Sequence, residues 1–145
     1  MIDNRRMLLT LVFIVIVATA IFYSFRSNPS LVEIRSAREI MRADMAVVRQ
    51  ECPGVVVFDD DRKAKVGSAI LSIEIASDSW GEGHISKYES MLSKLGWIHS
   101  SKIDGGVFMC KKGASALLVN SMRGNEMNGY IYMKYPSDPR AKCYH

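Results

Sequence analysis

The stretch from Met7 to Tyr23, MLLTLVFIVIVATAIFY, determines the layout of this chain. Its seventeen residues include no charged residue, no Gly and no Pro. As a helix it would extend roughly 25 Å, at the short end of the range for a membrane-spanning helix. A segment that is apolar all round and begins so near the N-terminus is untypical of a buried core helix. We therefore predict a transmembrane signal-anchor helix over residues 7–25, preceded by a short N-terminal tail, residues 1–6.

The same stretch also fits a cleaved secretory signal. Arg5 and Arg6 form a basic segment before it, and Ala18-Thr19-Ala20 matches the small-x-small pattern of a cleavage site. Against cleavage, the apolar run continues through Tyr23 without a polar spacer before the cut. The sequence favours an uncleaved anchor, and cleavage after Ala20, which would release a secreted domain, is the alternative.

Charges on either side of the apolar stretch bear on its orientation. Arg5 and Arg6 lie directly before it, and four further arginines follow it: Arg26, Arg35, Arg38 and Arg42. A plain count of Lys and Arg would place the C-terminal domain in the cytoplasm. However, the downstream arginines are interleaved with acidic residues, and long domains are translocated across the membrane largely regardless of their charge. We therefore expect a protein of the cell (inner) membrane whose C-terminal domain is extracytoplasmic.

Composition limits the partners of that domain. Beyond the apolar stretch the chain has 17 Lys and Arg against 14 Asp and Glu. This mild basic excess gives little support to nucleic-acid binding and fits a position beside a lipid bilayer. The remaining length suffices for one domain with a modest core.

Three cysteines indicate the redox environment. An odd number in an exported protein suggests one disulfide and one remaining thiol. Cys143 lies near a polar C-terminus and would tie this tail to the domain. The sequence slightly favours Cys110 as its partner and leaves Cys52 as the alternative. Three reduced cysteines would instead indicate a cytosolic domain.

An amphipathic helix is predicted directly after the anchor. Pro29 interrupts the preceding helix, and Ser30 followed by Glu33 forms a capping box. Apolar residues then recur with a helical period from Leu31 to Gln50, while several arginines lie off that stripe. We expect this linker helix, within residues 26–51, to pack on a sheet. A self-association helix and a helix lying on anionic lipid are the alternatives.

The remaining residues, 52–145, read as an extracytoplasmic α+β domain. Apolar residues at helical spacing predict a second amphipathic helix from Ile85 to Leu95, and period-two alternation with turn signals predicts six strands. The strands are expected over residues 55–58, 70–76, 97–103, 107–112, 114–122 and 130–135. Polar connections are expected over residues 59–63 and 123–129. The predicted fold class is therefore α+β: an N-terminal single transmembrane helix followed by an antiparallel sheet of five to six strands with two amphipathic helices packed on it.

No catalytic, cofactor or metal signature stands out in the sequence. The zinc-protease, Cys-x-x-Cys, Gly-x-Ser-x-Gly and P-loop patterns are absent. We therefore expect no enzyme activity and no cofactor. Candidate partner contacts are Trp80, in a Gly-flanked loop, and Tyr130 and Tyr132. These two tyrosines lie in a last strand that is apolar on both faces. If it lay at an edge of the sheet, that strand would need a cover, either the tail held by Cys143 or another protein.

The order of elements resembles one known family. An apolar N-terminal helix, an amphipathic continuation, an antiparallel sheet and a C-terminal cysteine follow one another, and Pro29 falls where a helix kink would lie. This layout resembles that of type IV pilins and pseudopilins, which implies a self-assembling subunit. The processing motif of that family is missing, because Arg6-Met7-Leu8 replaces the Gly step and no Glu lies between Met7 and Tyr23. The resemblance covers layout only.

These observations together predict a function class. The chain is expected to be a single-pass, membrane-anchored protein-binding or accessory subunit of a cell-envelope assembly, without catalytic activity. The alternatives are a pilin-like self-assembling structural subunit, which would be a homo-oligomer, and a secreted inhibitor or immunity-type binder released after Ala20. The identity of the protein partner does not follow from the sequence.

Overall fold

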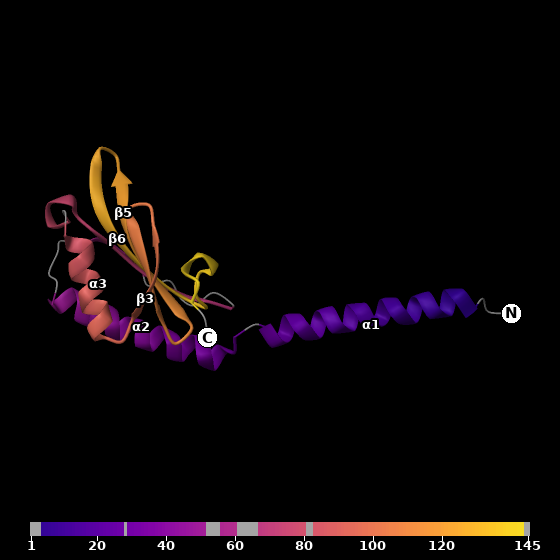
Figure 1. Ribbon diagram of the computed structural model, residues 1–145. Coiled ribbons are helices and arrows are strands. Elements are labelled where there is room, and N and C mark those ends of the chain that lie inside the picture. The colour runs from indigo at the N-terminus through magenta and orange to yellow at the C-terminus, as the bar shows by residue number, and fades with distance from the viewer. Residues whose placement is uncertain (1–3, 28, 52–55, 61–66, 81–82, 144–145) are drawn as a thin grey trace.

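The periodicities of the sequence correspond to helices and an antiparallel sheet in a computed structural model of the chain (Figure 1). The structure describes residues 4–27, 29–51, 56–60, 67–80 and 83–143. Its elements within these ranges are α1 (Asn4–Ser27), α2 (Leu31–Glu51), β1 (Val56–Asp60), β2 (Ala69–Ile75), η1 (Ser77–Ser79), α3 (His84–Lys94), β3 (Ile98–Ile103), β4 (Gly106–Lys111), β5 (Ala114–Arg123), β6 (Glu126–Tyr135) and η2 (Pro139–Ala141).

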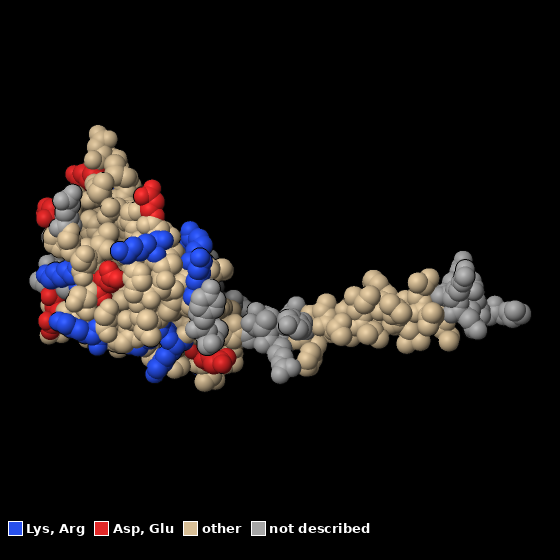
Figure 2. Space-filling model, viewed as in Figure 1, with Lys and Arg blue, Asp and Glu red and all other residues tan. Residues whose placement is uncertain are grey.

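Helix α1 extends away from the rest of the molecule as a separate rod (Figure 1). Between Met7 and Phe22 the exposed fractions of its large apolar side chains run from 38% to 69%. Figure 2 shows this part of the rod without charged groups, whereas the domain carries Lys, Arg, Asp and Glu side chains. Among the described residues, no helix combines the length and the apolar character that crossing a membrane requires.

One polar group of α1 is satisfied inside the helix. The Thr19 hydroxyl donates to the carbonyl oxygens of Val15, at 2.8 Å, and Ile16, at 2.9 Å. A hydroxyl that bonds back to the preceding turn needs no partner outside the helix. The polar residue therefore leaves the apolar character of the rod intact.

The capping box predicted at the start of α2 is confirmed. The Ser30 backbone N–H donates to Glu33 Oε2 at 2.7 Å, and the Glu33 N–H donates to Ser30 Oγ at 3.2 Å. The hydrogen bonds from the backbone and side chain of Ser30 lower the pKa of the Glu33 carboxyl. Because two N–H groups without helical partners are satisfied here, the chain starts a new helix immediately after Pro29.

The sheet has six antiparallel strands in the order β1-β2-β6-β5-β4-β3. This confirms the predicted α+β architecture and corrects one expectation. The last strand, β6, does not lie at an edge but in the centre, where it pairs with β2 and β5. A central strand is covered on its inner face by the core, which explains the apolar residues on that face.

The hairpin of β5 and β6 is longer than expected. The sequence predicted a polar connection over residues 123–129, but the two strands stay paired out to Arg123 and Glu126, and Met122 lies opposite Met127. Gly124, with a φ of 65°, supplies the left-handed conformation of the tight turn. Beyond the core, ladder hydrogen bonds hold the strands without burial, so no alternation of apolar residues marks them. Strand β1 similarly runs through Asp60, into the predicted turn.

The hydrophobic core lies between the inner face of the sheet and two helices. Helix α2 contacts β2 and β6, and α3 contacts β3, β4 and β5. Alternate residues of the strands enter this core, among them Leu71, Ile73, Met109, Leu118, Ile131 and Met133. The stripe of α2 contributes Ile34, Met41, Met45 and Val48. Both amphipathic helices therefore pack on one face, as the sequence predicted, which leaves the opposite face to other parts of the chain.

A buried ion pair fixes α2 against the sheet. Lys111 Nζ donates to Asp44 Oδ2 at 2.7 Å and to the Leu95 carbonyl oxygen at 2.6 Å. The Trp97 indole N–H donates to the same Asp44 oxygen at 2.8 Å. Because a buried carboxylate is stable only when it is paired, Asp44 sets the position of α2 relative to β4 and the end of α3.

Candidate protein-binding face

The outer face of the sheet points away from α2 and α3. The strand register places Tyr132 between Ser72 of β2 and Leu117 of β5, and Leu117 pairs in turn with Phe108 of β4. Tyr130 pairs with Val119. These residues alternate along each strand with members of the core, so they lie on the opposite face. The outer face thus presents aromatic and aliphatic side chains in the centre of the sheet.

The C-terminal tail covers one half of the outer face. The Asp138 N–H donates to Ser115 Oγ at 2.8 Å, and Ser100 Oγ donates to the Ala141 carbonyl oxygen. A disulfide joins Cys110 of β4 to Cys143, with 5.6 Å between the Cα atoms. The expected disulfide is therefore present, and it pairs the residues that the sequence favoured.

Phe108 occupies the centre of this covered half. Its side chain is only 1% exposed although it does not belong to the core cluster under the helices. The Arg140 guanidinium lies 5.9 Å from the centre of the Phe108 ring, and Ala141 is fully buried. The tail therefore packs a small second apolar layer against the outer face.

The tail also contains its own ion pair. Arg140 Nε donates to Asp138 Oδ1 at 3.0 Å, and Arg140 Nη2 donates to Asp138 Oδ2 at 3.0 Å. The Arg140 backbone N–H donates to Oδ1 as well, at 2.9 Å. The side-chain hydrogen bond from Arg140 is the main cause that lowers the pKa of Asp138 to about 2, and the same pair raises the pKa of Arg140. This two-pronged pair holds the guanidinium over Phe108.

The described residues of the tail form their hydrogen bonds and disulfide with β3, β4 and β5, and the outer face continues beyond them to β6. We name this remaining part the open half and define it by Leu117, Val119, Tyr130 and Tyr132, which are all half-buried. The two tyrosine rings stack, with 6.3 Å between centroids and 17° between planes. Side chains at alternate positions of one strand point the same way, so the stack presents two rings to one side of the molecule. Stacked aromatic rings on a central strand form a rigid apolar surface.

A polar cluster borders the open half. Glu74 pairs with Tyr130 across the strands, and its carboxylate accepts a hydrogen bond from Asn128 Nδ2 at 2.7 Å. Arg123 is 3.5 Å from the other Glu74 oxygen. Asn128 Oδ1 is buried and has no hydrogen-bond partner in the described part of the chain. The tyrosines are therefore flanked by a carboxylate and by an acceptor without a donor.

The predicted contact residues have separated into two groups. Tyr130 and Tyr132 lie together on the outer face, as their spacing in one strand implied. Trp80 lies on the inner side, only 5% exposed, with its ring stacked on Tyr88 and its indole N–H bonded to Asn120 Oδ1 at 2.9 Å. In this position Trp80 offers no surface to a partner. Cys52, the alternative disulfide residue, falls outside the described residues.

Gly129 explains why Trp80 is held inside. A Cβ atom at this position would lie 2.0 Å from the indole ring, so only Gly leaves room for the ring against β6. Sequence reasoning missed this pairing, and it also missed Leu117 and Val119 as members of the outer face. Their signal was the alternation along β5, which separates the two faces but does not say which face the helices cover.

No protein-family model, curated protein or solved structure matches this chain. Within the described residues, no three His, Cys, Asp or Glu side chains come together in a group that could hold a metal ion. The functional argument therefore rests on the geometry of the chain itself.

Proposed function

We propose that this protein is a membrane-anchored, non-catalytic protein-binding subunit of a cell-envelope assembly. The observation that carries the proposal is the open half of the outer face, where Tyr130 and Tyr132 stack, half-buried, beside the half that the tail closes. Tyrosine is enriched in protein interfaces because its ring is apolar and its hydroxyl can hydrogen-bond. Aromatic side chains on a rigid central strand lose little conformational freedom on binding.

The polar border suggests the chemistry of the partner. Glu74 places a carboxylate next to Tyr130. A Lys or Arg side chain of a partner would be attracted to this carboxylate and would lie over an aromatic ring. We propose an apolar segment with a basic residue at one end as the element that binds.

The membrane attachment is proposed from α1. Its exposed apolar side chains need an apolar environment, and a lipid bilayer supplies one. A single pass, with the domain on the extracytoplasmic side of the inner membrane, is the proposed arrangement. The Cys110–Cys143 disulfide supports that side, because disulfides persist in oxidising compartments and are rare in the cytosol.

Affinity purification in mild detergent tests the proposal. The full chain and its Tyr130→Ser/Tyr132→Ser variant are purified from membranes under identical conditions, and co-purifying proteins are quantified. We expect the recovery of one envelope protein to fall at least tenfold with the variant, because interface aromatic residues often contribute about 2 kcal/mol or more each to the binding free energy. A variant at the exposed Ile98 of β3, Ile98→Ser, is the matched control and should retain the partner. Equal recovery with all three proteins would refute the assignment of the face.

A second function is favoured by the shape of the stem. Helix α1 leaves the domain as a rod beyond the start of α2, and α2 packs along the sheet (Figure 1). This arrangement suits a self-assembling subunit that packs rods side by side, as the pilin-like layout implied. Crosslinking of the full chain in membranes distinguishes the two functions: a ladder of self-crosslinked products favours assembly, and a single product with another protein favours the accessory subunit.

A further inference from the structure

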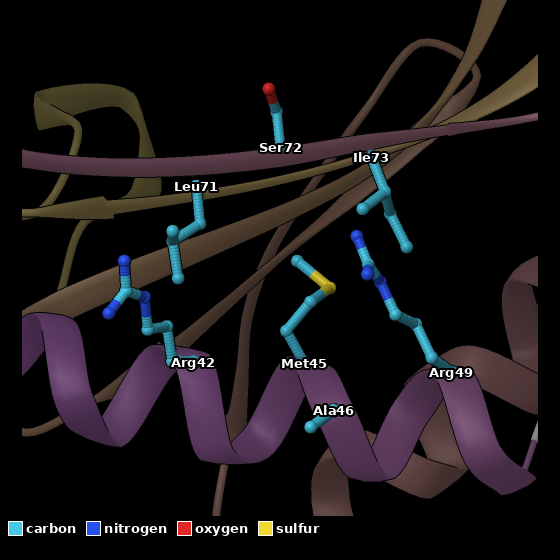
Figure 3. Close-up of a pocket in the computed structure, with 7 residues that line it drawn as sticks. All are labelled: Arg42, Met45, Ala46, Arg49, Leu71, Ser72 and Ile73. Atoms are coloured by element: carbon cyan, nitrogen blue, oxygen red, sulfur yellow. The ribbon is translucent and has the colours of Figure 1, made fainter. Parts of the chain in front are cut away.

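The C-terminal tail covers the sheet in a different way from the helices. On the inner face, Met45 of α2 points toward the strand, and Leu71 and Ile73 of β2 point toward the helix (Figure 3). These side chains are 2–5% exposed and belong to the core, so removing α2 would expose the centre of the fold. The tail, yellow in Figure 1, lies on the other side of the strands from α3 and packs against the ring of Phe108.

The upstream end of the tail is attached through backbone donors. The Ser137 N–H donates to the Gly113 carbonyl oxygen at 2.8 Å, and the Asp138 N–H donates to Ser115 Oγ at 2.8 Å. Ser115 pairs with Lys134 near the end of β6, so these bonds form directly where the chain leaves the sheet. This end of the tail can therefore act as a hinge.

The turn η2, which follows, satisfies its own backbone donors. The Ala141 N–H donates to the Asp138 carbonyl oxygen at 2.9 Å, and the Lys142 N–H donates to the Pro139 carbonyl oxygen at 3.4 Å. These hydrogen bonds do not require the turn to lie on the sheet. Its position on the outer face is therefore fixed by side chains and by the disulfide.

The disulfide is the covalent part of that attachment. Ser100 and Ser101 of β3 donate hydroxyl hydrogen bonds to carbonyl oxygens of the turn, and Ala141 buries one methyl group. A neutral hydrogen bond contributes little net stability, because water replaces it when the groups separate. The Cys110–Cys143 bridge cannot be replaced by water, and it is the link that holds the downstream end of the tail.

The backbone next to the bridge is in an unfavourable conformation. Lys142 has a φ of 50°, in the left-handed region that costs energy for residues other than Gly. Such a residue persists where the surrounding structure fixes it, and its next neighbour is Cys143 of the disulfide. Opening the bridge would free Lys142 to adopt a right-handed or extended backbone, which favours movement of this end away from the sheet.

The ring beneath the tail is continuous with the open half. The strand register pairs Phe108 of β4 with Leu117 of β5, and Leu117 with Tyr132 of β6. These three side chains form one row across the outer face. Uncovering Phe108 would therefore extend the apolar surface of the open half by an aromatic ring that is now 1% exposed.

We propose that the tail is a redox-controlled strap over the protein-binding face. Reduction of the Cys110–Cys143 bridge releases residues 139–143 from the sheet and uncovers Phe108, which enlarges the surface that the partner contacts. The release is a property of this chain alone, whereas the gain in partner binding rests on the proposed function.

The reductant is a dithiol, such as the active site of a thioredoxin-like protein. One of its thiolates attacks a sulfur of the bridge and forms a mixed disulfide, while the other cysteine leaves as a thiolate and takes up a proton. The second thiol of the reductant then displaces the remaining cysteine. The dithiol becomes a disulfide, and Cys110 and Cys143 become thiols. Both cysteines are half-buried, so part of the bridge faces solvent.

Hydroxyl-radical footprinting of the full chain in mild detergent tests the release. Oxidised protein and protein reduced with dithiothreitol are desalted under nitrogen, labelled and compared by mass spectrometry, and a thiol count verifies the reduction. We expect labelling of Phe108 to rise severalfold on reduction, because the tail no longer covers the ring. Trp97, which is 2% exposed in the core, should stay protected in both states.

Cysteine variants provide the matched controls. Cys52→Ser retains the bridge and should show the same rise at Phe108 on reduction. Cys110→Ser/Cys143→Ser lacks the bridge and should be labelled at Phe108 with or without dithiothreitol. Unchanged labelling of Phe108 in the fully reduced protein would overturn the strap. An equal rise at Trp97 would overturn it too, because it would show that reduction unfolds the whole domain.

Affinity purification in the two redox states tests the effect on binding. We expect Cys110→Ser/Cys143→Ser to recover about tenfold more of the partner than the oxidised chain, since the interface gains one buried aromatic side chain. Equal recovery, with Phe108 uncovered in the footprint, would overturn the control of binding by the strap. The Tyr130→Ser/Tyr132→Ser variant reports separately on the proposed function, because its loss of the partner does not depend on the bridge.

Discussion

The two faces of the sheet are covered in different ways. On the inner face, α2 and α3 close over alternate residues of all the central strands, and buried polar groups such as Asp44 are fully paired. On the outer face the disulfide-bound tail covers the residues around Phe108, and the tyrosines of the open half are half-buried. The inner face therefore provides most of the stability of the fold, whereas part of the outer face is available for recognition.

The largest effect on this comparison should come from Asp44. Replacing it, in Asp44→Ala, leaves the Lys111 ammonium without its counter-charge and the Trp97 N–H without an acceptor. We expect the free energy of unfolding to fall by about 3–5 kcal/mol, because removing one partner of a buried pair leaves the other uncompensated. Urea unfolding of the full chain measures this. The exposed Asp78, in Asp78→Ala, is the control and should change it by about 0.5 kcal/mol or less.

A smaller loss is expected when the tail is released. Cys143→Ser removes a bridge between residues 33 positions apart, which should cost about 2–4 kcal/mol. Unfolding in urea and hydrogen exchange at Phe108 and Ala141 measure the loss and its location. Cys52→Ser removes a cysteine outside the bridge and should leave exchange at these residues unchanged. Unchanged exchange in Cys143→Ser would show that the tail stays in place without the bridge.

Acid should loosen the same half of the outer face. The folded pKa of Asp138 is about 2 against an ordinary value of 3.8, so its ionised form stabilises the folded state above about pH 4. That contribution is lost as the pH falls from about 4 to about 2, where the carboxylate becomes protonated. In the Asp138→Asn variant the stabilisation by an ionised carboxylate is absent at every pH. The stability difference between the two proteins, measured by thermal unfolding, should therefore shrink over that range, and a constant difference would contradict the ion pair's role.

The smallest change in stability is expected in the open half. Tyr130→Ser/Tyr132→Ser should lower the free energy of unfolding by only about 1 kcal/mol, because each ring is half-buried and lies outside the core under the helices. Partner binding should nevertheless fall at least tenfold. Thermal unfolding and affinity purification on the same preparations separate the two effects. A loss of stability as large as that of Asp44→Ala would place these tyrosines in the structural core of the fold.

Much of the architecture follows from local sequence patterns. The capping box at Ser30 and the amphipathic period of α2 predicted a helix within one residue of its observed end, and the alternation around Ile73 predicted β2. Gly96, with a φ of 87°, follows α3 as a left-handed residue, the position in which glycine commonly ends a helix. Patterns of this kind depend on residues close together in the sequence, so they can be interpreted without knowledge of the tertiary structure.

The parts that could not be predicted depend on contacts distant in sequence. The central position of β6 results from pairing with β2, more than fifty residues earlier, and alternation alone does not select a neighbour. The inward position of Trp80 depends on the missing side chain of Gly129. The ion pair of Lys111 and Asp44 joins residues that are 67 positions apart. Sequence reasoning located the tyrosine pair but not the surface that surrounds it.

Site-specific photo-crosslinking in living cells tests the central claim most directly. A photoreactive phenylalanine analogue replaces Tyr132 in the open half or Lys102, an exposed residue of β3, in otherwise identical chains. We expect irradiation to produce a discrete crosslinked product with one envelope protein from position 132 and none from position 102. The absence of a product at position 132, or the same products from both positions, would contradict the claim that the open half of the sheet is the surface through which this protein binds its partner.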